Sequence, residues 1–330
     1  MSLDPSVAAV RLAVRRVLAD VARPGEPVLV ACSGGADSLA LLAATVFESS
    51  TESLRVVGVV VDHGLQEGSE EHTARVVGQM ALLGVDETAS IRVGVEPAGQ
   101  GLESAARQAR YAALGQLAEH FGARTCLLGH TLDDQAETVL LGLTRGSGGR
   151  SLAGMRRSVD GLFHRPLLGV GRAQTEAACT AEGIQWWTDP HNSDPRFARA
   201  RVRHDVLPVL ERELGPGVAV TLARTADQLR ADTAYLDEAA DAALASVRDG
   251  DGLPVVRLAM LHEALRTRVL RLAAVTAGAR AAELFHVHVT ELDRLVTDWH
   301  GQRAVRLPGH VTAHRDDGVI RFAPTPPLPD

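Results

Sequence analysis

Short apolar runs that alternate with helical patterns constrain the fold of the first 145 residues more than any other feature of this sequence. The apolar runs lie at 27–32, 54–61, 91–95 and 125–128, and helical patterns at 38–47, 71–83, 102–121 and 132–143 follow them in turn. Runs that are apolar on both faces are typical of buried parallel strands. The alternation therefore predicts an α/β fold with a doubly wound parallel sheet, followed by a smaller, mainly helical domain.

Three polar clusters follow predicted strands directly. They are SGGADS at 33–38, DHG at 62–64 and GHTLDDQAET at 129–138. Ligands of open α/β sheets bind beyond the carboxyl ends of the strands, where such clusters meet. The three clusters therefore predict one shared ligand site.

The first cluster has the composition of a phosphate-binding loop. Gly34 and Gly35 allow the backbone to approach an oxyanion, and the N-terminus of the next helix presents unpaired N–H groups. Ser33 and Ser38 add hydroxyl donors, whereas Asp37 is better suited to bind Mg²⁺ than to contact a phosphate. A simple turn with a serine cap is the alternative for these residues taken alone.

All 34 basic residues are arginine, because the chain contains no lysine. This excludes a GxxxxGK[ST] phosphate loop and a pyridoxal Schiff base, since the protein would have to supply a lysine to both. The chain has three cysteines, Cys32, Cys126 and Cys179, which are widely spaced and form no Cys-x-x-Cys pair. A zinc ribbon and a disulfide framework are therefore not expected.

The sequence indicates a cytoplasmic protein without a membrane segment. No stretch reaches the roughly 18 unbroken apolar residues of a membrane helix, and no signal segment is evident at the N-terminus.

Two basic stretches stand out against the net charge of −7. Residues 145–172 contain six arginines and one acid, and residues 196–212 contain five arginines and two acids. A solvated surface would explain one such stretch, but two of them after a nucleotide-binding pattern indicate polyanion binding. The candidate RNA contacts are Arg145, Arg150, Arg156, Arg157, Arg199 and Arg201.

The breaker cluster LGPG at 214–217 predicts a domain boundary, with a first domain over 1–214 that contains the three polar clusters and a helical second domain over 217–330. Helical patterns in the second domain cover 218–247, 258–277 and 282–299. Alternation around an Asp-Asp-Gly turn then predicts a small β-hairpin. The proline-rich end, 324–330, is expected to be disordered.

The cluster SGGADS resembles the SGGxDS loop of the PP-loop, or N-type ATP pyrophosphatase, superfamily, whose members cleave ATP between the α and β phosphates. Within that superfamily the chain is similar to the tRNA(Ile)-lysidine synthases. The segments that carry the similarity, in the order and spacing of that family, are VDHGL (61–65), ARQARY (106–111), GHTLDDQAET (129–138), RGSGG (145–149) and HNSDPRFARARVRHDVLP (191–208).

The resemblance implies a two-step reaction that uses ATP and Mg²⁺. ATP first adenylates the oxygen at carbon 2 of the wobble cytidine, position 34, in a tRNA(Ile) with a CAU anticodon, and pyrophosphate leaves. The side-chain amine of free L-lysine then attacks that carbon, and AMP departs. The product, lysidine, changes both the codon that the tRNA reads and the amino acid that it carries.

The resemblance also assigns site residues. The predicted ATP contacts are Ser33, Gly34, Gly35, Ala36, Asp37, Ser38, Asp62, His63 and Gly129, with Asp37 as the Mg²⁺ ligand. His130, Asp134 and Glu137 fall on one helix face at i, i+4 and i+7, and stacked acids beside an anionic cofactor require a cation between them. By resemblance, Asp134, Glu137 and Arg110 hold the lysine substrate, His130 lies near the reacting centre, and Arg203 reaches a phosphate of ATP or tRNA.

Several alternatives remain open from the sequence. A capped helix with a satisfied histidine would explain residues 129–138 taken alone, and either a carboxylate or His130 could accept the lysine proton. A tRNA thiolase, a small-molecule synthetase and a nucleotide sensor without catalysis are the rival functions. Ala200 stands where the family has asparagine, the extra C-terminal domain of longer relatives is not expected here, and a homodimer is possible.

Overall fold

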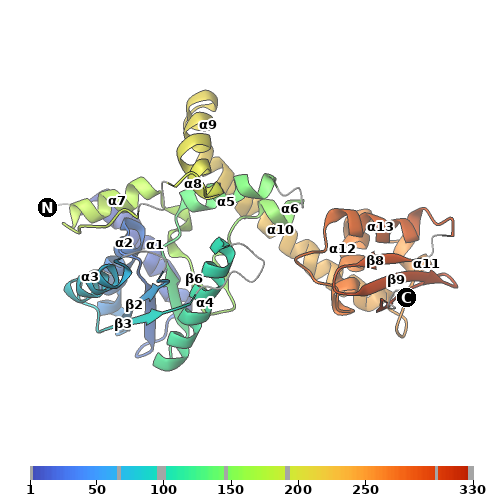
Figure 1. Ribbon diagram of the computed structural model, residues 1–330, viewed down its shortest axis with the longest axis horizontal. Helices are drawn as coiled ribbons and strands as arrows, with labels where there is room; N and C mark the ends of the chain where they lie inside the picture. Colours follow the sequence, from blue (N-terminus) through green and yellow to red (C-terminus); the bar gives the residue numbers. More distant parts are fainter. Residues whose placement is uncertain are drawn as a thin grey trace. The chain divides into compact units, whose positions relative to one another are not determined.

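The computed structural model describes residues 3–64, 68–94, 102–144, 148–189, 194–301 and 304–325. The chain divides into two compact units, Met1–Leu141 with Gly154–Arg224 and Gly142–Ala153 with Thr225–Asp330 (Figure 1). The chain enters the second unit for good within helix α10 (Val218–Val247), a few residues beyond the breaker cluster at 214–217.

The helices and strands follow one another in this order: α1 (Pro5–Val21), β1 (Pro27–Ala31), α2 (Ala36–Glu52), β2 (Arg55–Asp62), α3 (Ser69–Leu82), β3 (Glu87–Arg92), α4 (Leu102–Phe121), β4 (Thr125–Leu128), α5 (Leu132–Leu143), α6 (Gly149–Leu152), β5 (Ser158–Val159), β6 (Phe163–His164), the 3-10 helix η1 (Pro166–Gly169), α7 (Arg172–Ala181), α8 (Ala198–Arg201), the π-helical turn η3 (Val202–Val206), α9 (Leu207–Leu214), α10, β7 (Leu253–Pro254), α11 (Val255–Ala259), α12 (Glu263–Thr276), α13 (His286–Thr297), β8 (Val305–Leu307), β9 (Val311–Asp316) and β10 (Val319–Pro324).

The first unit contains a six-stranded sheet in the order β3-β2-β1-β4-β6-β5. All neighbouring strands are parallel except β5 and β6, and Leu29 at the centre of β1 pairs with Val57 on one side and Cys126 on the other. The chain builds outward through β2 and β3 and then returns to the other side of β1 with β4. The carboxyl ends of β1 and β4 therefore flank the switch point, where ligands of such sheets bind.

Helices cover both faces of this sheet. Val28 and Val30 of β1 belong to the core formed with α1, α2, α3 and α7, whereas Leu29 between them belongs to the core formed with α4. This two-residue period follows from the strand geometry and explains why the strands are apolar throughout. The predicted doubly wound α/β fold is confirmed.

Helix α1 precedes the first predicted strand and was not expected from the sequence. Asp4 caps it by accepting a hydrogen bond from Ser6 N at 2.8 Å, and Pro5 occupies the first turn. Its buried face consists of Val7, Val10, Val14 and Leu18. The Asp-Pro start and this helical spacing are the signals that identify the helix.

The third strand differs from the prediction, because β3 covers Glu87–Arg92 instead of 91–95. It lies at the edge of the sheet and is only partly buried, so Glu87, Thr88 and Ser90 interrupt the apolar run that marks the inner strands. Val95 lies outside the described residues. The short β5–β6 pair and α7 had no strong sequence pattern either.

The second unit combines helices with a four-stranded antiparallel sheet in the order β7-β10-β9-β8. Asp317 and Gly318 have φ angles of 46° and 75°, as a two-residue hairpin turn between β9 and β10 requires. The structure therefore extends the expected hairpin by one strand on each side. Residues 326–330 of the proline-rich end lie outside the described residues.

Within the described residues, no helix combines the length and apolar character that a bilayer crossing requires.

Candidate active site

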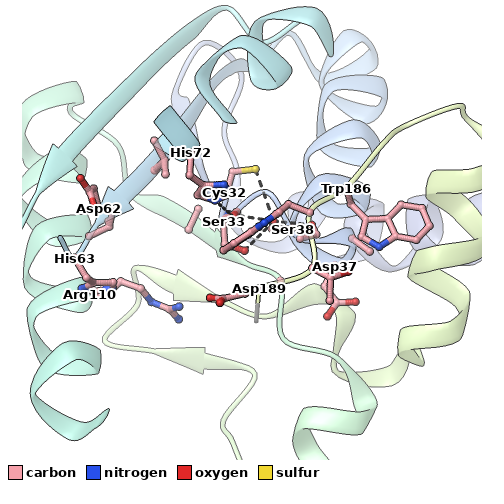
Figure 2. Close-up of a pocket in the computed structure, with 18 of the residues that line it drawn as sticks. Cys32, Ser33, Asp37, Ser38, Asp62, His63, His72, Arg110, Trp186 and Asp189 are labelled. Carbon is pink, nitrogen blue, oxygen red and sulfur yellow. Dashed lines mark hydrogen bonds between the residues drawn. The ribbon is translucent and has the colours of Figure 1, made fainter. Parts of the chain in front are cut away.

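The loop between β1 and α2 is held closed by its two serines (Figure 2). Ser33 N donates to Ser38 Oγ at 3.1 Å, and Ser38 Oγ donates to the carbonyl oxygen of Gly35 at 2.9 Å. Gly34 has a φ of +81°, and a Cβ there would lie 2.7 Å from Val76 Cγ2. Glycine is therefore required at this position both by the backbone and by the packing of α3.

The N-terminus of α2 has no side-chain cap. Gly35 is the N-cap residue, and its extended backbone leads into Ala36 and Asp37. The N–H groups of a first helical turn have no partner within the helix, and the helix dipole places partial positive charge there. This end of α2 is thus suited to bind an anion.

Asp37, in the first turn of α2, is held by helix α7. Thr175 Oγ1 donates to Asp37 Oδ1, and Arg172 Nε lies 3.6 Å from Asp37 Oδ2. Burial raises the pKa of Asp37 to about 6, although Thr175 and Arg172 favour the charged form. An approaching cation would stabilise the carboxylate further.

The second strand end carries Asp62 and His63. Asp62 accepts hydrogen bonds from Gly64 N at 2.8 Å and from Arg92 Nε at 3.0 Å. Burial raises the pKa of Asp62, but these hydrogen bonds and the charge of Arg92 together lower it by more, so the pKa lies below its ordinary value. Burial and the Arg110 guanidinium lower the pKa of His63, whose Nδ1 is buried without a partner among the described residues.

The fourth strand end approaches the first one closely at Gly129. A Cβ on Gly129 would lie 3.1 Å from the backbone of Asp37 and Ser38, so glycine here lets the two loops meet. His130 follows with its Nδ1 buried and unpartnered among the described residues. Burial, and then the positive charge of Arg110, lower the pKa of His130 to about 3, so the imidazole is neutral at pH 7.

Asp134 lies in the first turn of α5, and its carboxylate binds the residue that precedes the helix. Its Oδ2 accepts from Thr131 N at 2.8 Å and from Thr131 Oγ1 at 3.0 Å. Its Oδ1 accepts from Arg172 Nη2 and from Arg203 Nη2, both at 3.1 Å. Burial opposes ionisation, but Arg172 outweighs it, and the pKa of Asp134 is lowered.

Glu137, one turn further along α5, has a side chain with 0% exposure. Arg203 donates to both of its oxygens, from Nε at 2.7 Å and from Nη2 at 3.0 Å. Arg172 and Arg199 lie 3.5 and 3.6 Å from the same carboxylate. A buried carboxylate needs such partners, and here three arginines supply them.

These strand ends line one pocket of about 1450 Å³. The predicted residues that line it are Ser33, Gly35, Ala36, Asp37, Ser38, Asp62, His63, Arg110, Gly129, His130, Asp134, Arg199 and Arg203. Gly34 and Glu137 are not among its lining residues in the described part of the chain. Figure 2 shows His63 and Arg110 next to each other, away from Asp37 and Trp186.

The predicted site omitted aromatic residues of the pocket, among them His72, Trp186 and Trp187. Trp187 N donates to the carbonyl oxygen of Gly34 at 2.9 Å, and its ring centroid lies 4.0 Å from that of His72. His72 Nε2 lies 3.1 Å from the carbonyl oxygen of Ser33, and Trp186 lines the same pocket. The adjacent tryptophans after α7 were the available signal, but no pattern connected them with the loop after β1.

A group of arginines surrounds Tyr111 beside this pocket. Arg165 Nη2 and Arg107 Nη2 donate to the Tyr111 hydroxyl at 2.7 and 3.4 Å, and Arg110 follows one turn after Arg107. Within the described ranges, none of these three arginines forms an ion pair, and Nε of Arg110 and of Arg165 is buried without a partner. Burial and the neighbouring guanidinium groups lower the pKa of Arg107. Positive charge therefore gathers here, and the described residues supply no ion-pair partner for it.

The other predicted RNA contacts lie in different surroundings. Arg150 pairs with Asp237 at 2.5 Å in the second unit, and Arg201 donates to the carbonyl oxygen of Pro195 at 2.6 Å. Arg156 and Arg157 are exposed, and Arg145 lies outside the described residues.

The described residues of the pocket form no cluster of protein ligands for a metal ion. Among the described residues, no group of three or more His, Cys, Asp or Glu side chains could hold one. All three cysteines are free and buried, and burial raises the pKa of Cys126 and of Cys179 to about 12. Their thiols therefore lack the thiolate character that sulfur chemistry requires.

The chain matches two family models. Residues 9–210 match the PP-loop domain, and residues 253–321 match the TilS substrate binding domain. The tRNA(Ile)-lysidine synthase of Salinispora arenicola is 54% identical, and the alignment covers 99% of each chain. That of Streptomyces coelicolor is 49% identical over 97% of this chain and 99% of its own.

A solved structure shares the fold at much lower identity. The U34-tRNA thiolase of Methanococcus maripaludis, determined with its [4Fe-4S] cluster, has a TM-score of 0.57 and 18% identity. The match covers 68% of this chain and 79% of that one. At this identity the match shows a shared fold.

Proposed function

This chain belongs to the tRNA(Ile)-lysidine synthase family, and we propose that its strand-end pocket is where ATP activates the wobble cytidine and lysine then replaces AMP. The enzyme is an ATP-dependent ligase that forms a carbon–nitrogen bond on tRNA(Ile). One observation supports the assignment to this pocket. The uncapped N-terminus of α2 and the cluster of carboxylates and arginines around Asp134 lie at the same switch point. The first feature suits a triphosphate, and the second suits a charged amine.

ATP binds, in this proposal, with its phosphates at the N-terminus of α2. The first-turn N–H groups and Ser33 supply donors, and Ser38 keeps the loop in shape. Mg²⁺ takes few protein ligands when phosphates supply the rest, so the single carboxylate of Asp37 fits as its protein ligand. The bound ion would neutralise part of the charge on the phosphates.

In the adenylation step, the oxygen at carbon 2 of the cytidine attacks the α-phosphorus. An oxygen–phosphorus bond forms, the bond to the oxygen bridging the α and β phosphates breaks, and pyrophosphate leaves. Arg110 and neutral His130 both line the pocket, and among the described residues Arg110 Nε and His130 Nδ1 are buried without a hydrogen-bond partner. Both nitrogens are therefore available to the cytidine ring or to the lysine carboxylate.

In the second step, the lysine amine attacks carbon 2, the carbon–nitrogen bond forms, and the bond to the AMP oxygen breaks. The ammonium group must first lose a proton. The pKa of His130 is about 3 and the pKa of Asp134 is also lowered, so basicity does not favour one over the other, and the acceptor is either a pocket carboxylate or His130. Asp134 lines the pocket and contacts the lysine nitrogen, whereas Glu137 lies behind it and holds Arg203.

The tRNA approaches over the arginines at the pocket rim. Arg199 and Arg203 line the pocket, and Arg107 and Arg110, which form no ion pair within the described residues, offer further positive charge to backbone phosphates. Arg156, Arg157 and Arg201 are exposed and extend this role, whereas Arg145 and Arg150 stay predicted tRNA contacts. A tRNA substrate implies a cytoplasmic location, and a homodimer stays a prediction that light scattering would test.

The test is to incubate the protein with unmodified tRNA(Ile) bearing a CAU anticodon, ATP, Mg²⁺ and labelled lysine. We expect label in the wobble nucleoside and an equal amount of AMP. Asp37→Asn should abolish AMP formation. Glu87→Gln is the matched control, because its exposed pair with Arg55 lies at the amino end of β2 and β3, away from the pocket.

The outcomes separate the rival functions. AMP without lysine attachment would keep the ATP site and reject the substrate. Transfer of sulfur to the tRNA would favour a thiolase, although the three buried cysteines oppose it. Neither product, under conditions in which a known synthase is active, would contradict the proposal.

A further inference from the structure

Arg172 connects the two loops that flank the switch point. It is the first residue of α7, and its backbone N–H donates to Asp133 Oδ2 at 2.7 Å, which fixes its position against α5. Its guanidinium group lies 3.6 Å from Asp37 Oδ2 on the ATP loop and 3.1 Å from Asp134 Oδ1 on α5. One side chain thus contacts both the proposed Mg²⁺ ligand and the proposed lysine ligand.

Asp134 has no open oxygen in this arrangement. Oδ2 accepts two hydrogen bonds from Thr131, and Oδ1 accepts one from Arg172 and one from Arg203. A carboxylate oxygen has two acceptor directions, so both oxygens are saturated. The lysine ammonium can reach Asp134 only if one of the two arginines withdraws.

Arg172 is the arginine that is held less firmly. Arg203 donates to Glu137 at 2.7 and 3.0 Å in addition to its contact with Asp134. Apart from the contact with Asp134, the guanidinium group of Arg172 has only longer contacts with carboxylates of the described residues, at 3.5 Å to Glu137 and 3.6 Å to Asp37. Charge-assisted hydrogen bonds weaken over such distances, so displacing Arg172 costs less than displacing Arg203.

The negative charge of a bound nucleotide would attract the guanidinium group of Arg172. The triphosphate brings several negative charges to the N-terminus of α2, beside Asp37 and within reach of Arg172. Building on the proposed function, we propose that Arg172 is a positioning residue that couples the two substrates. Its guanidinium group leaves Asp134 for the nucleotide phosphates, and Asp134 then accepts the lysine ammonium.

The proposal has a thermodynamic consequence. If Arg172 blocks Asp134 until ATP binds, lysine binds more tightly to the nucleotide complex than to the free enzyme, and the nucleotide gains by the same factor from lysine. Couplings of this kind are commonly about tenfold or more. Lysine would therefore enter after ATP, and its amine would meet a pocket that already contains the nucleotide.

The experiment measures this coupling directly. The affinity for labelled lysine is determined by equilibrium dialysis on the full chain, with and without Mg²⁺ and α,β-methylene-ATP, whose carbon bridge prevents cleavage. In the unchanged protein we expect lysine to bind about tenfold more tightly with the nucleotide. In Arg172→Gln, lysine should bind with the same affinity in both conditions, because Asp134 is open in both.

Two further variants exclude a merely structural effect. Arg172→Lys keeps the charge and should retain part of the coupling, and it also serves as the test if Arg172→Gln does not fold. Arg55→Gln removes an exposed ion pair at the amino end of β2 and should leave the coupling unchanged. Coupling that persists in Arg172→Gln, or that is absent from the unchanged protein, overturns the proposal. Failure to bind lysine under either condition would instead contradict the proposed function.

Discussion

Both the backbone conformation and the packing at position 34 require glycine. Its φ of +81° is unfavourable for any residue with a Cβ, and that Cβ would lie 2.7 Å from Val76. We expect Gly34→Ala to lower the free energy of unfolding by about 1–3 kcal/mol and to weaken ATP binding, because the loop must shift. Urea denaturation and nucleotide titration measure the two effects.

The matched control for this substitution is Gly183→Ala. Gly183 has a φ of +69°, and a Cβ at this position would have no neighbouring atom within 4 Å, so the variant carries the backbone strain without the clash and outside the pocket. It should lose stability and keep its ATP affinity. Equal ATP affinity in both variants would show that the shape of the loop at Gly34 does not matter for the nucleotide.

His130 connects the pocket with the pH dependence of stability. Its pKa falls from an ordinary 6.5 to about 3 in the folded protein, so the unfolded chain takes up the proton first as the pH decreases. Stability should therefore fall below pH 6.5, by up to about 1.4 kcal/mol per pH unit for this one proton. His130→Gln should flatten the curve between pH 7 and pH 4. Parallel curves for the two proteins, measured by urea unfolding, would contradict the shift.

At the scale of elements, two of the three carboxylates of α5 have different tasks. Asp134 lines the pocket, whereas Glu137 is buried against Arg203 and Arg199. Asp134→Asn should raise the KM for lysine at least tenfold (on the order of 1.4 kcal/mol) and change the KM for ATP little. Glu137→Gln should impair both substrates and lower stability by about 3–5 kcal/mol, because it removes a fully buried carboxylate from partly buried arginines and leaves them without that partner.

Two-substrate kinetics and thermal unfolding test this division. If Glu137→Gln raised the KM for lysine alone and kept its stability, Glu137 would be a direct lysine ligand, as the family resemblance alone implies. Thermal unfolding distinguishes the two roles, because only the loss of a buried partner of the arginines would lower the stability of the first unit.

The elements differ in how far the sequence could predict them. Strands β1 and β4 are apolar on both faces, and both the strands and the polar clusters after them were predicted. Edge strand β3 is partly exposed and contains polar residues, so it has no continuous apolar run. The strand was therefore predicted at 91–95 instead of Glu87–Arg92. Trp187 and Arg172 reach the site from more than 100 residues beyond the ATP loop, and only the folded packing of α7 brings them there.

At the scale of the whole molecule, charge is distributed unevenly. The chain has a net charge of −7, yet the pocket is lined by as many arginines as carboxylates among the described residues. Positive and negative side chains are therefore equal in number at the pocket, where a polyanionic substrate would bind, although the whole chain is acidic. This is also why composition alone argued against RNA binding while the arginine-rich stretches argued for it.

The division into two units predicts two separable stabilities. Each unit has its own core: Leu41 is fully buried in the first, and Leu258 is fully buried in the second. Replacing either leucine with alanine should cost about 2–5 kcal/mol in its own unit. Leu258→Ala should lower one calorimetric transition and leave ATP affinity unchanged, whereas Leu41→Ala should lower the other and weaken ATP binding through α2. A single transition that both variants shift equally would show that the units unfold together, and the site residues of the first unit would then depend on the second for their stability.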